Sequence, residues 1–138
     1  MNERLFDIDA AARRRVCRAL AGELVGATDL VFAYVHGSFL TDQPFHDIDV
    51  AVLLGREVRA ATSGILELSE RLSRAVGYPV DSRALNDAPL SFQFRALQGT
   101  LLMVRDDETL ANFMERVGRR YLDIAPLLRR ATREAFTR

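Results

Sequence analysis

The sequence predicts an α/β (α+β) domain in which helices flank a small mixed sheet. Four short apolar runs of strand length alternate with four longer segments that have helical periodicity, and no internal repeat or low-complexity linker interrupts them. The 138 residues are 49% hydrophobic and 28% charged, which suits one globular domain able to bury a core. We therefore interpret residues 1–138 as a single domain with a C-terminal helical segment from about residue 107.

The first helix and the strand after it begin this pattern. Asp9 is a candidate N-cap for a helix over residues 10–25. Its apolar face is predicted from residues spaced by four, namely Ala12, Val16, Leu20 and Leu24. Residues 30–35 are continuously apolar, as in a strand buried on both faces, and this strand stops at Gly37.

Two further strands each contain a carboxylate. Residues 48–54 predict a second buried strand that includes Asp49. A helix is predicted over residues 57–76, with Gly77 as its C-cap. The next strand is predicted at residues 78–85, with Asp81 in its middle.

The C-terminal third is predicted to be mainly helical. Residues 86–98 form a helix with Pro89 in its first turn, and residues 100–104 form a short fourth strand. Helical spacing of apolar residues then continues from Asp107 almost to the end of the sequence, where Pro126 should kink or divide the helix. These apolar positions are Leu110, Phe113, Met114, Val117, Tyr121, Ile124 and Leu128.

Composition excludes several classes of function. All 19 basic residues are arginine, so there is no lysine for a Schiff base, a P-loop or a ligase-type nucleotidyl transfer. Cys17, His36 and His46 are too few for a closed structural zinc site, and a lone cysteine suits a reducing cytoplasm. The net charge of zero gives no global attraction to nucleic acid, and no stretch is long enough to span a membrane. We expect a cytoplasmic protein without a membrane or direct nucleic-acid partner.

The residues with the clearest chemistry lie around the second strand. Asp47 and Asp49 are two apart on an extended chain, so both side chains point to one face and repel each other unless a cation lies between them. Oxygen-only ligation suits Mg²⁺, which completes its coordination with water and substrate phosphates. Asp81 is expected at the same cation, because a buried aspartate without a partner is costly. Gly37 and Ser38 would bring backbone amides and a hydroxyl close to a phosphate, more favourably if Ser38 opens a short helix.

These features together resemble the polymerase-beta-type nucleotidyltransferase superfamily. The signature is Gly37-Ser38, a spacer of eight residues, Asp47-x-Asp49 and the later strand residue Asp81. Over residues 10–130, the downstream segments 80–89, 99–103 and 120–123 further resemble minimal nucleotidyltransferase (MNT) proteins. Many of those proteins are antitoxins encoded beside a HEPN-domain ribonuclease toxin.

The resemblance implies a polymerase-beta-like core and a catalytic role for each motif. Asp47 and Asp49 would bridge two Mg²⁺ ions, and Asp81 would complete the coordination of one and accept the proton of the attacking hydroxyl. Gly37 and Ser38 would hold the β- and γ-phosphates of ATP. The resemblance implies AMPylation of a hydroxyl group on a HEPN toxin, with tyrosine as the favoured acceptor. It also implies that the toxin forms a hetero-oligomer with this antitoxin.

Other functions stay open at this point. The run Phe39-Leu40-Thr41-Asp42 stands where the family usually has a small residue, an arginine and a second glycine, and His46 stands where serine is common. One alternative is therefore a non-catalytic antitoxin that binds and occludes the toxin. Another is a small-molecule nucleotidyltransferase, which is disfavoured because no substrate domain is evident. The arginine-rich C-terminal segment is interpreted as a solvated helix face, with a docking surface as the alternative.

Overall fold

Four strands form one mixed sheet in the order β3-β2-β1-β4 in the computed structural model, which describes residues 4–55 and 62–136. Their bounds are β1 Leu30–His36, β2 Ile48–Leu54, β3 Val80–Ala84 and β4 Thr100–Val104. Strand β1 pairs antiparallel with β2 and β4, whereas β2 and β3 are parallel. The predicted fold class, a small mixed sheet with flanking helices, is confirmed.

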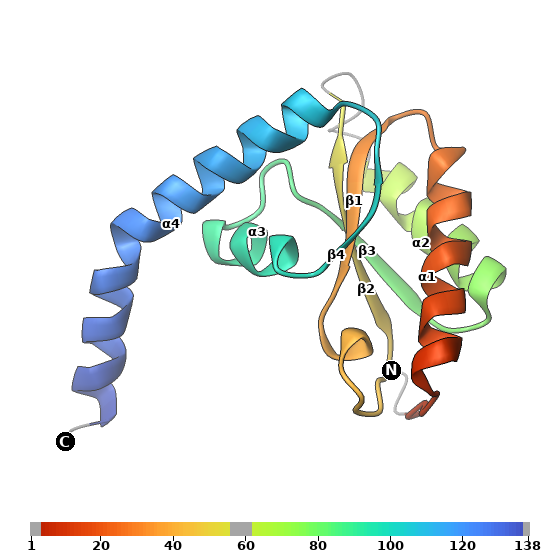
Figure 1. The fold of residues 1–138 in the computed structure, drawn as a ribbon, viewed down its shortest axis with the longest axis horizontal. Coiled ribbons are helices and arrows are strands. Elements are labelled where there is room, and N and C mark those ends of the chain that lie inside the picture. The colour runs from red at the N-terminus through yellow and green to blue at the C-terminus, as the bar shows by residue number, and fades with distance from the viewer. Residues whose placement is uncertain (1–3, 56–61, 137–138) are drawn as a thin grey trace.

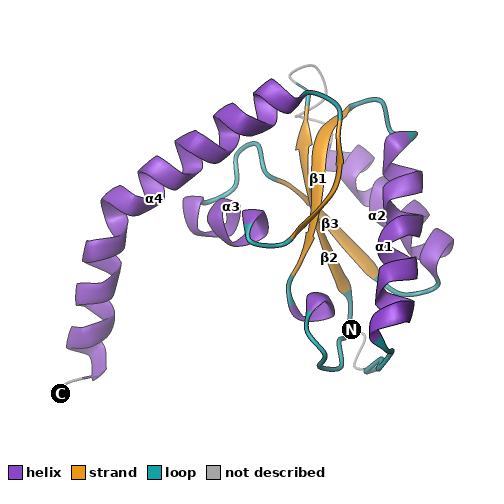
Figure 2. Ribbon diagram, viewed as in Figure 1, coloured by secondary structure: helices purple, strands orange, loops and turns teal. Residues whose placement is uncertain are grey.

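The helices cover both faces of this sheet. Helices α1 (Ala10–Val25) and α2 (Thr62–Val76) lie on one side, and α3 (Leu90–Leu97) and the first half of α4 (Asp107–Phe136) lie on the other (Figures 1 and 2). No helix in the described part of the chain is long and apolar enough to cross a membrane.

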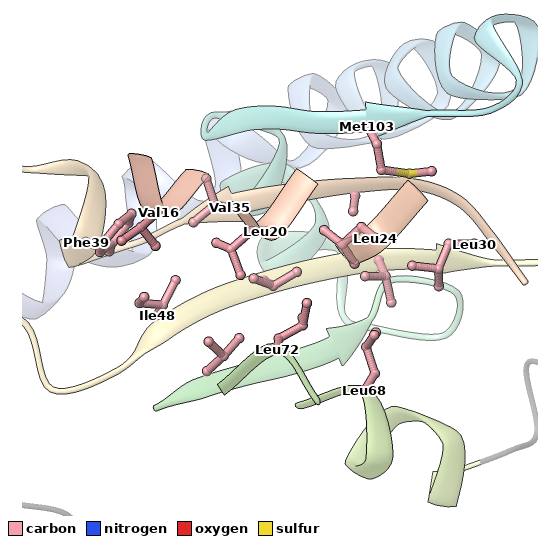
Figure 3. Packing of buried hydrophobic residues seen from close by; sticks show 14 of the residues in the cluster. Val16, Leu20, Leu24, Leu30, Val35, Phe39, Ile48, Leu68, Leu72 and Met103 are labelled. Carbon is pink, nitrogen blue, oxygen red and sulfur yellow. The ribbon is translucent and has the colours of Figure 1, made fainter. Parts of the chain in front are cut away.

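Two cores explain why the central strands are almost continuously apolar. One core packs α1 and α2 residues such as Leu20 and Leu72 against Ile48 and its neighbours in the sheet (Figure 3). The opposite face of the sheet packs on α3 and α4 through a second core. Its buried members are Phe32, Tyr34, Ala51, Leu53, Leu85, Ala96, Leu110, Phe113 and Val117. Because β1 and β2 are buried on both faces, apolar residues occupy nearly every position in them.

Several predicted element ends agree with the structure. The Asp9 carboxylate accepts a hydrogen bond of 2.7 Å from the Ala12 amide, as an N-cap does. Gly77 has φ +80° directly after α2, the left-handed conformation of a helix C-terminus. The predicted start of α2 at residue 57 falls outside the described residues.

Other element ends differ for local reasons. Strand β3 begins at Val80, after the predicted residue 78, because Pro79 has no amide to join the ladder, and it ends at Ala84, one residue before the predicted end. Helix α3 begins at Leu90 with Pro89 as its N-cap, so the predicted start at residue 86 is wrong. The Asn86 side chain instead makes two hydrogen bonds of 2.9 Å to the backbone of Leu54 and holds this segment as a turn at the end of β2.

The two long helices differ from their sequence patterns in which residues they bury. In α1 the fourth buried position is Arg13 instead of Ala12. In α4, Met114 shares the helical apolar spacing of its neighbours but is 45% exposed. Pro126 lies inside α4 and does not divide it, and the helix changes direction along its length (Figure 1).

Candidate active site

Three aspartates converge at one end of the sheet, on the face that α3 covers. Asp47 lies directly before β2, Asp49 lies in β2, and Asp81 is the register partner of Asp49 on the parallel strand β3. One carboxylate oxygen from each residue can be chosen so that all three lie within 4.8 Å of one another. This all-oxygen donor set fits a hard divalent cation such as Mg²⁺ or Mn²⁺.

The electrostatics of Asp49 indicate a site short of positive charge. Burial first, and then the neighbouring charges of Asp47 and Asp81, raise the pKa of Asp49 to about 6. Arg83 and Arg95 oppose this shift but do not cancel it. A cation among the carboxylates would stabilise all three in their ionised form.

Asp81 joins the cluster for a different reason from the one predicted. It is not a buried aspartate without a partner, because its side chain is 40% exposed and its Oδ2 accepts a hydrogen bond of 3.1 Å from Arg83 Nε. Its place beside Asp49 follows from the parallel pairing of β2 and β3.

Gly37 lies directly against Asp49. It has φ +85° and ψ −161°, a backbone conformation that is essentially confined to glycine. A Cβ atom at this position would lie 2.6 Å from Asp49 Oδ2, so any side chain here would displace the carboxylate. The lack of a side chain at Gly37 therefore allows the Asp49 carboxylate to occupy its position. It also leaves the Gly37 backbone open to a ligand.

Ser38 follows Gly37, begins the short 3₁₀ helix η1 (Ser38–Leu40) and is exposed. The amide of Thr41 and its hydroxyl both donate to the Ser38 carbonyl, at 3.0 and 2.7 Å, which closes the turn. The predicted short helix at Ser38 is thus a single turn, whose dipole is small. Any phosphate contact would come from individual amides and the hydroxyl.

Arg13 anchors the loop that follows Gly37, a role that the sequence analysis did not predict. Its side chain is buried and donates to the carbonyls of Phe39 at 2.7 Å and Gln43 at 3.0 Å. Its guanidinium also lies 5.3 Å from the centre of the Phe45 ring. Its position three residues before Val16 places Arg13 on the inward face of α1, and this spacing could have indicated that it is buried.

The sequence analysis also did not predict a group of basic and aromatic residues next to the three aspartates. The Phe92 ring of α3 lies near the guanidinium groups of Arg83 and Arg95 and makes an edge contact with the His36 ring. Burial first, and then Arg95 and Arg83, lower the pKa of His36 below its usual value. His36 is therefore a neutral ring at pH 7, packed at the end of β1.

Comparison with known proteins adds an independent line of evidence. A family model described as polymerase beta, nucleotidyltransferase matches residues 20–108. A search of curated proteins finds no match.

Solved structures share the fold. One is a complex of a tri-AMPylated Shewanella oneidensis HEPN toxin with MNT antitoxin, in which a chain is 19% identical with a TM-score of 0.56, covering 88% of this chain and 97% of that chain. Another, a toxin–antitoxin structure with AMP-PNP, is 18% identical with a TM-score of 0.60, covering 81% and 98%. A third, the toxin–antitoxin MntA–HepT, is 16% identical with a TM-score of 0.56, covering 90% and 99%. At these identities the likeness is one of fold.

Proposed function

Because the chain belongs to the polymerase beta nucleotidyltransferase family, we propose that it transfers AMP from ATP to a hydroxyl group of a partner protein. The single observation that carries this proposal is the convergence of the carboxylates of Asp47, Asp49 and Asp81 within 4.8 Å. Such a cluster is unfavourable alone and suits a site that binds a metal–triphosphate complex.

Each residue of the site has a role in this proposal. Asp47 and Asp49 hold the divalent metal, and Asp81 completes the coordination and accepts the proton of the attacking hydroxyl. Gly37 and Ser38 bind the β- and γ-phosphates through backbone amides and the serine hydroxyl. When bound there, Mg²⁺, as two ions in our proposal, would neutralise charge on the triphosphate and make the α-phosphorus more electrophilic.

The acceptor hydroxyl comes from another molecule. The three aspartates provide acid–base and metal-binding groups but no hydroxyl nucleophile in the cluster. A HEPN toxin is the proposed acceptor, because chains of this fold occur in complexes of HEPN toxins with MNT antitoxins and one such toxin is tri-AMPylated. Transfer to a toxin tyrosine would neutralise the toxin, so the protein would act as a cytoplasmic antitoxin in a hetero-oligomer.

We also propose that residues 1–138 form one nucleotidyltransferase domain. The family match ends at residue 108, where α4 is just beginning. The first half of α4 contributes Leu110, Phe113 and Val117 to the same core as β1 and β2, which supports its inclusion in the domain.

The decisive experiment compares modification with neutralisation. The protein, its HEPN partner and Mg-ATP are incubated, and the toxin is analysed by intact-mass spectrometry and by an RNase assay after the antitoxin is removed. We expect the toxin to gain the mass of one or more AMP residues and to stay inactive. Asp47→Ala and Asp49→Ala should abolish both effects, whereas Asp123→Ala, an exposed α4 control, should retain them. Full neutralisation by the double aspartate variant without a mass change would establish occlusion instead.

Metal dependence is tested without the toxin. Calorimetry should show tight ATP binding only when Mg²⁺ or Mn²⁺ is present, because the carboxylates alone repel a triphosphate. Equal ATP affinity in excess chelator would rule out a metal site at the three aspartates.

A further inference from the structure

The loop that joins β1 to β2 carries both halves of the proposed site. Gly37 and Ser38, the proposed triphosphate-binding residues, lie at its start, and Asp47, a proposed metal ligand, lies at its end. The shape of this loop therefore decides where the phosphates lie relative to the metal.

The end of the loop next to Asp47 is held by strong contacts of its own. Phe45, two residues before Asp47, is buried, and its backbone exchanges two hydrogen bonds of 2.9 and 3.0 Å with the backbone of Phe6. Its ring also packs against the ring of Tyr78, with centroids 5.7 Å apart. The other two aspartates of the site are held by the pairing of β2 with β3. The metal ligands are thus supported by the sheet and by the aromatic contacts of Phe45.

The part of the loop that follows Ser38 is held by Arg13 of α1. The two terminal nitrogens of its buried guanidinium donate to the carbonyls of Phe39 at 2.7 Å and Gln43 at 3.0 Å. Its Nε donates to the carbonyl of Ile8 at 3.1 Å. One planar group therefore ties both sides of the turn to the segment that precedes α1, and the rigid arrangement of its donors fixes the carbonyl directions.

Arg13 acts on the backbone of the loop and does not touch the aspartates. Its hydrogen bonds and ion pair within residues 4–55 and 62–136 involve none of the three carboxylates of the site. The ion pair is with Asp7, at 4.0 Å, and the Asp7 side chain is 75% exposed, so this pair is weak. The loop carbonyls are therefore its main partners.

We propose that Arg13 is a positioning residue for the triphosphate, which holds the turn of Ser38 where that turn binds the β- and γ-phosphates. This rests on the proposed ATP site and extends it to a residue that would not touch the substrate. Because the metal ligands have other supports, loss of Arg13 should weaken phosphate binding and spare metal binding. A contact that is equally strong in bound ATP and in the transition state affects KM, so kcat should change little.

The first test measures nucleotide and metal binding separately by calorimetry. Arg13→Met should weaken Mg-ATP binding about tenfold, as expected when a group that makes phosphate hydrogen bonds is misplaced. Its affinity for Mn²⁺ without nucleotide should match that of the wild type. Arg13→Lys should lie between the two, because an ammonium group keeps the charge but lacks the planar fork of donors. All titrations are made below the unfolding transition of each variant.

Arg105→Met is the matched control for lost stability. Arg105 likewise donates to three backbone carbonyls, but at the opposite end of β1 from the aspartates: Leu30 at 3.0 Å, and Val25 and Ala27 at 3.1 Å. This variant should lose stability and bind Mg-ATP as the wild type does. Unchanged ATP affinity in Arg13→Met, or an equal loss in Arg105→Met, would overturn the proposal. A matching loss of Mn²⁺ affinity in Arg13→Met would also refute a role confined to phosphate binding.

The second test restores the missing group. Arg13 and Leu40 line two surface cavities, of 540 and 400 Å³, through which free guanidinium could enter the space left in Arg13→Ala. In the transfer reaction this variant should show a KM for ATP raised about tenfold with little change in kcat. Guanidinium chloride at non-denaturing concentrations should lower that KM again, whereas sodium chloride or urea should not. A fall in kcat with KM unchanged, or equal recovery in urea, would refute the positioning role.

The positioning role and the proposed function fail in different ways. If the wild type binds Mg-ATP but adds no AMP to any partner, the proposed transfer is wrong, and calorimetry still decides whether Arg13 positions the phosphate-binding turn. If the wild type transfers AMP and the Arg13 variants show the same KM for ATP, the transfer stands and the positioning role is wrong.

Discussion

Replacing Gly37 with alanine should disturb both the geometry of the metal site and the stability of the fold. The new Cβ would lie 2.6 Å from Asp49 Oδ2, so the carboxylate would have to move by about 0.8 Å to restore ordinary contact at 3.4 Å. The backbone conformation at φ +85° adds strain of about 1–3 kcal/mol in any residue but glycine. We therefore expect Gly37→Ala to lower both the free energy of unfolding and the affinity for metal.

The size of the metal effect follows from the role of the displaced group. Loss of a contact that orients a metal ligand commonly lowers metal affinity by about 10–100-fold, and we expect a loss in this range. The assay is calorimetric titration with Mn²⁺, together with urea unfolding in excess chelator. The expected unfolding change is a lower midpoint with an unchanged slope.

Gly77→Ala is the matched control for this experiment. Gly77 also has a positive φ, +80°, but a Cβ there would meet no atom within 4 Å. Its alanine variant should lose stability through backbone strain and keep wild-type affinity for Mn²⁺. If Gly37→Ala binds Mn²⁺ as tightly as Gly77→Ala does, then either Asp49 does not bind the metal or Gly37 does not set its position.

Three further predictions concern charge, phosphate binding and the anchor of the loop. Because the pKa of Asp49 is raised to about 6, ionisation of Asp49 should cost the metal-free protein stability as the pH rises from 4.5 to 7, so Asp49→Asn should stabilise it more at pH 7 than at pH 4.5 in urea unfolding; a stabilisation independent of pH would contradict this. Ser38→Ala should weaken Mg-ATP binding in calorimetry and leave stability within about 0.5 kcal/mol, since Ser38 is exposed; unchanged affinity would remove its hydroxyl from the phosphate site. Arg13→Met should lower the free energy of unfolding by about 2–4 kcal/mol, because the carbonyls of Phe39 and Gln43 would lose their hydrogen-bond donor. Arg14→Met, on the exposed face of α1, should have little effect on the free energy of unfolding.

The local elements could be read from the sequence because their causes are local. The strand β2 is an apolar run bounded by polar residues, and the ends of two helices follow from side-chain and backbone chemistry at Asp9 and Gly77. The pairing of Asp47 with Asp49 needs only the two-residue period of an extended chain. The motif of Gly37 and Ser38 followed by these aspartates was likewise enough to predict the family that the family model confirms.

Which residues come together in the site depends on contacts between segments that are distant in the sequence, and these could not be predicted from local patterns. Which strands pair, and in which register, is decided by the burial of both faces of the whole sheet, and this brings Asp81 beside Asp49 although it is half-exposed and paired with Arg83. The same packing lays α3 over the aspartates and so brings Arg95 to the site. Sequence spacing alone could not show that the Arg13 guanidinium is buried, because an arginine becomes tolerable in a core only when backbone carbonyls from another segment surround it.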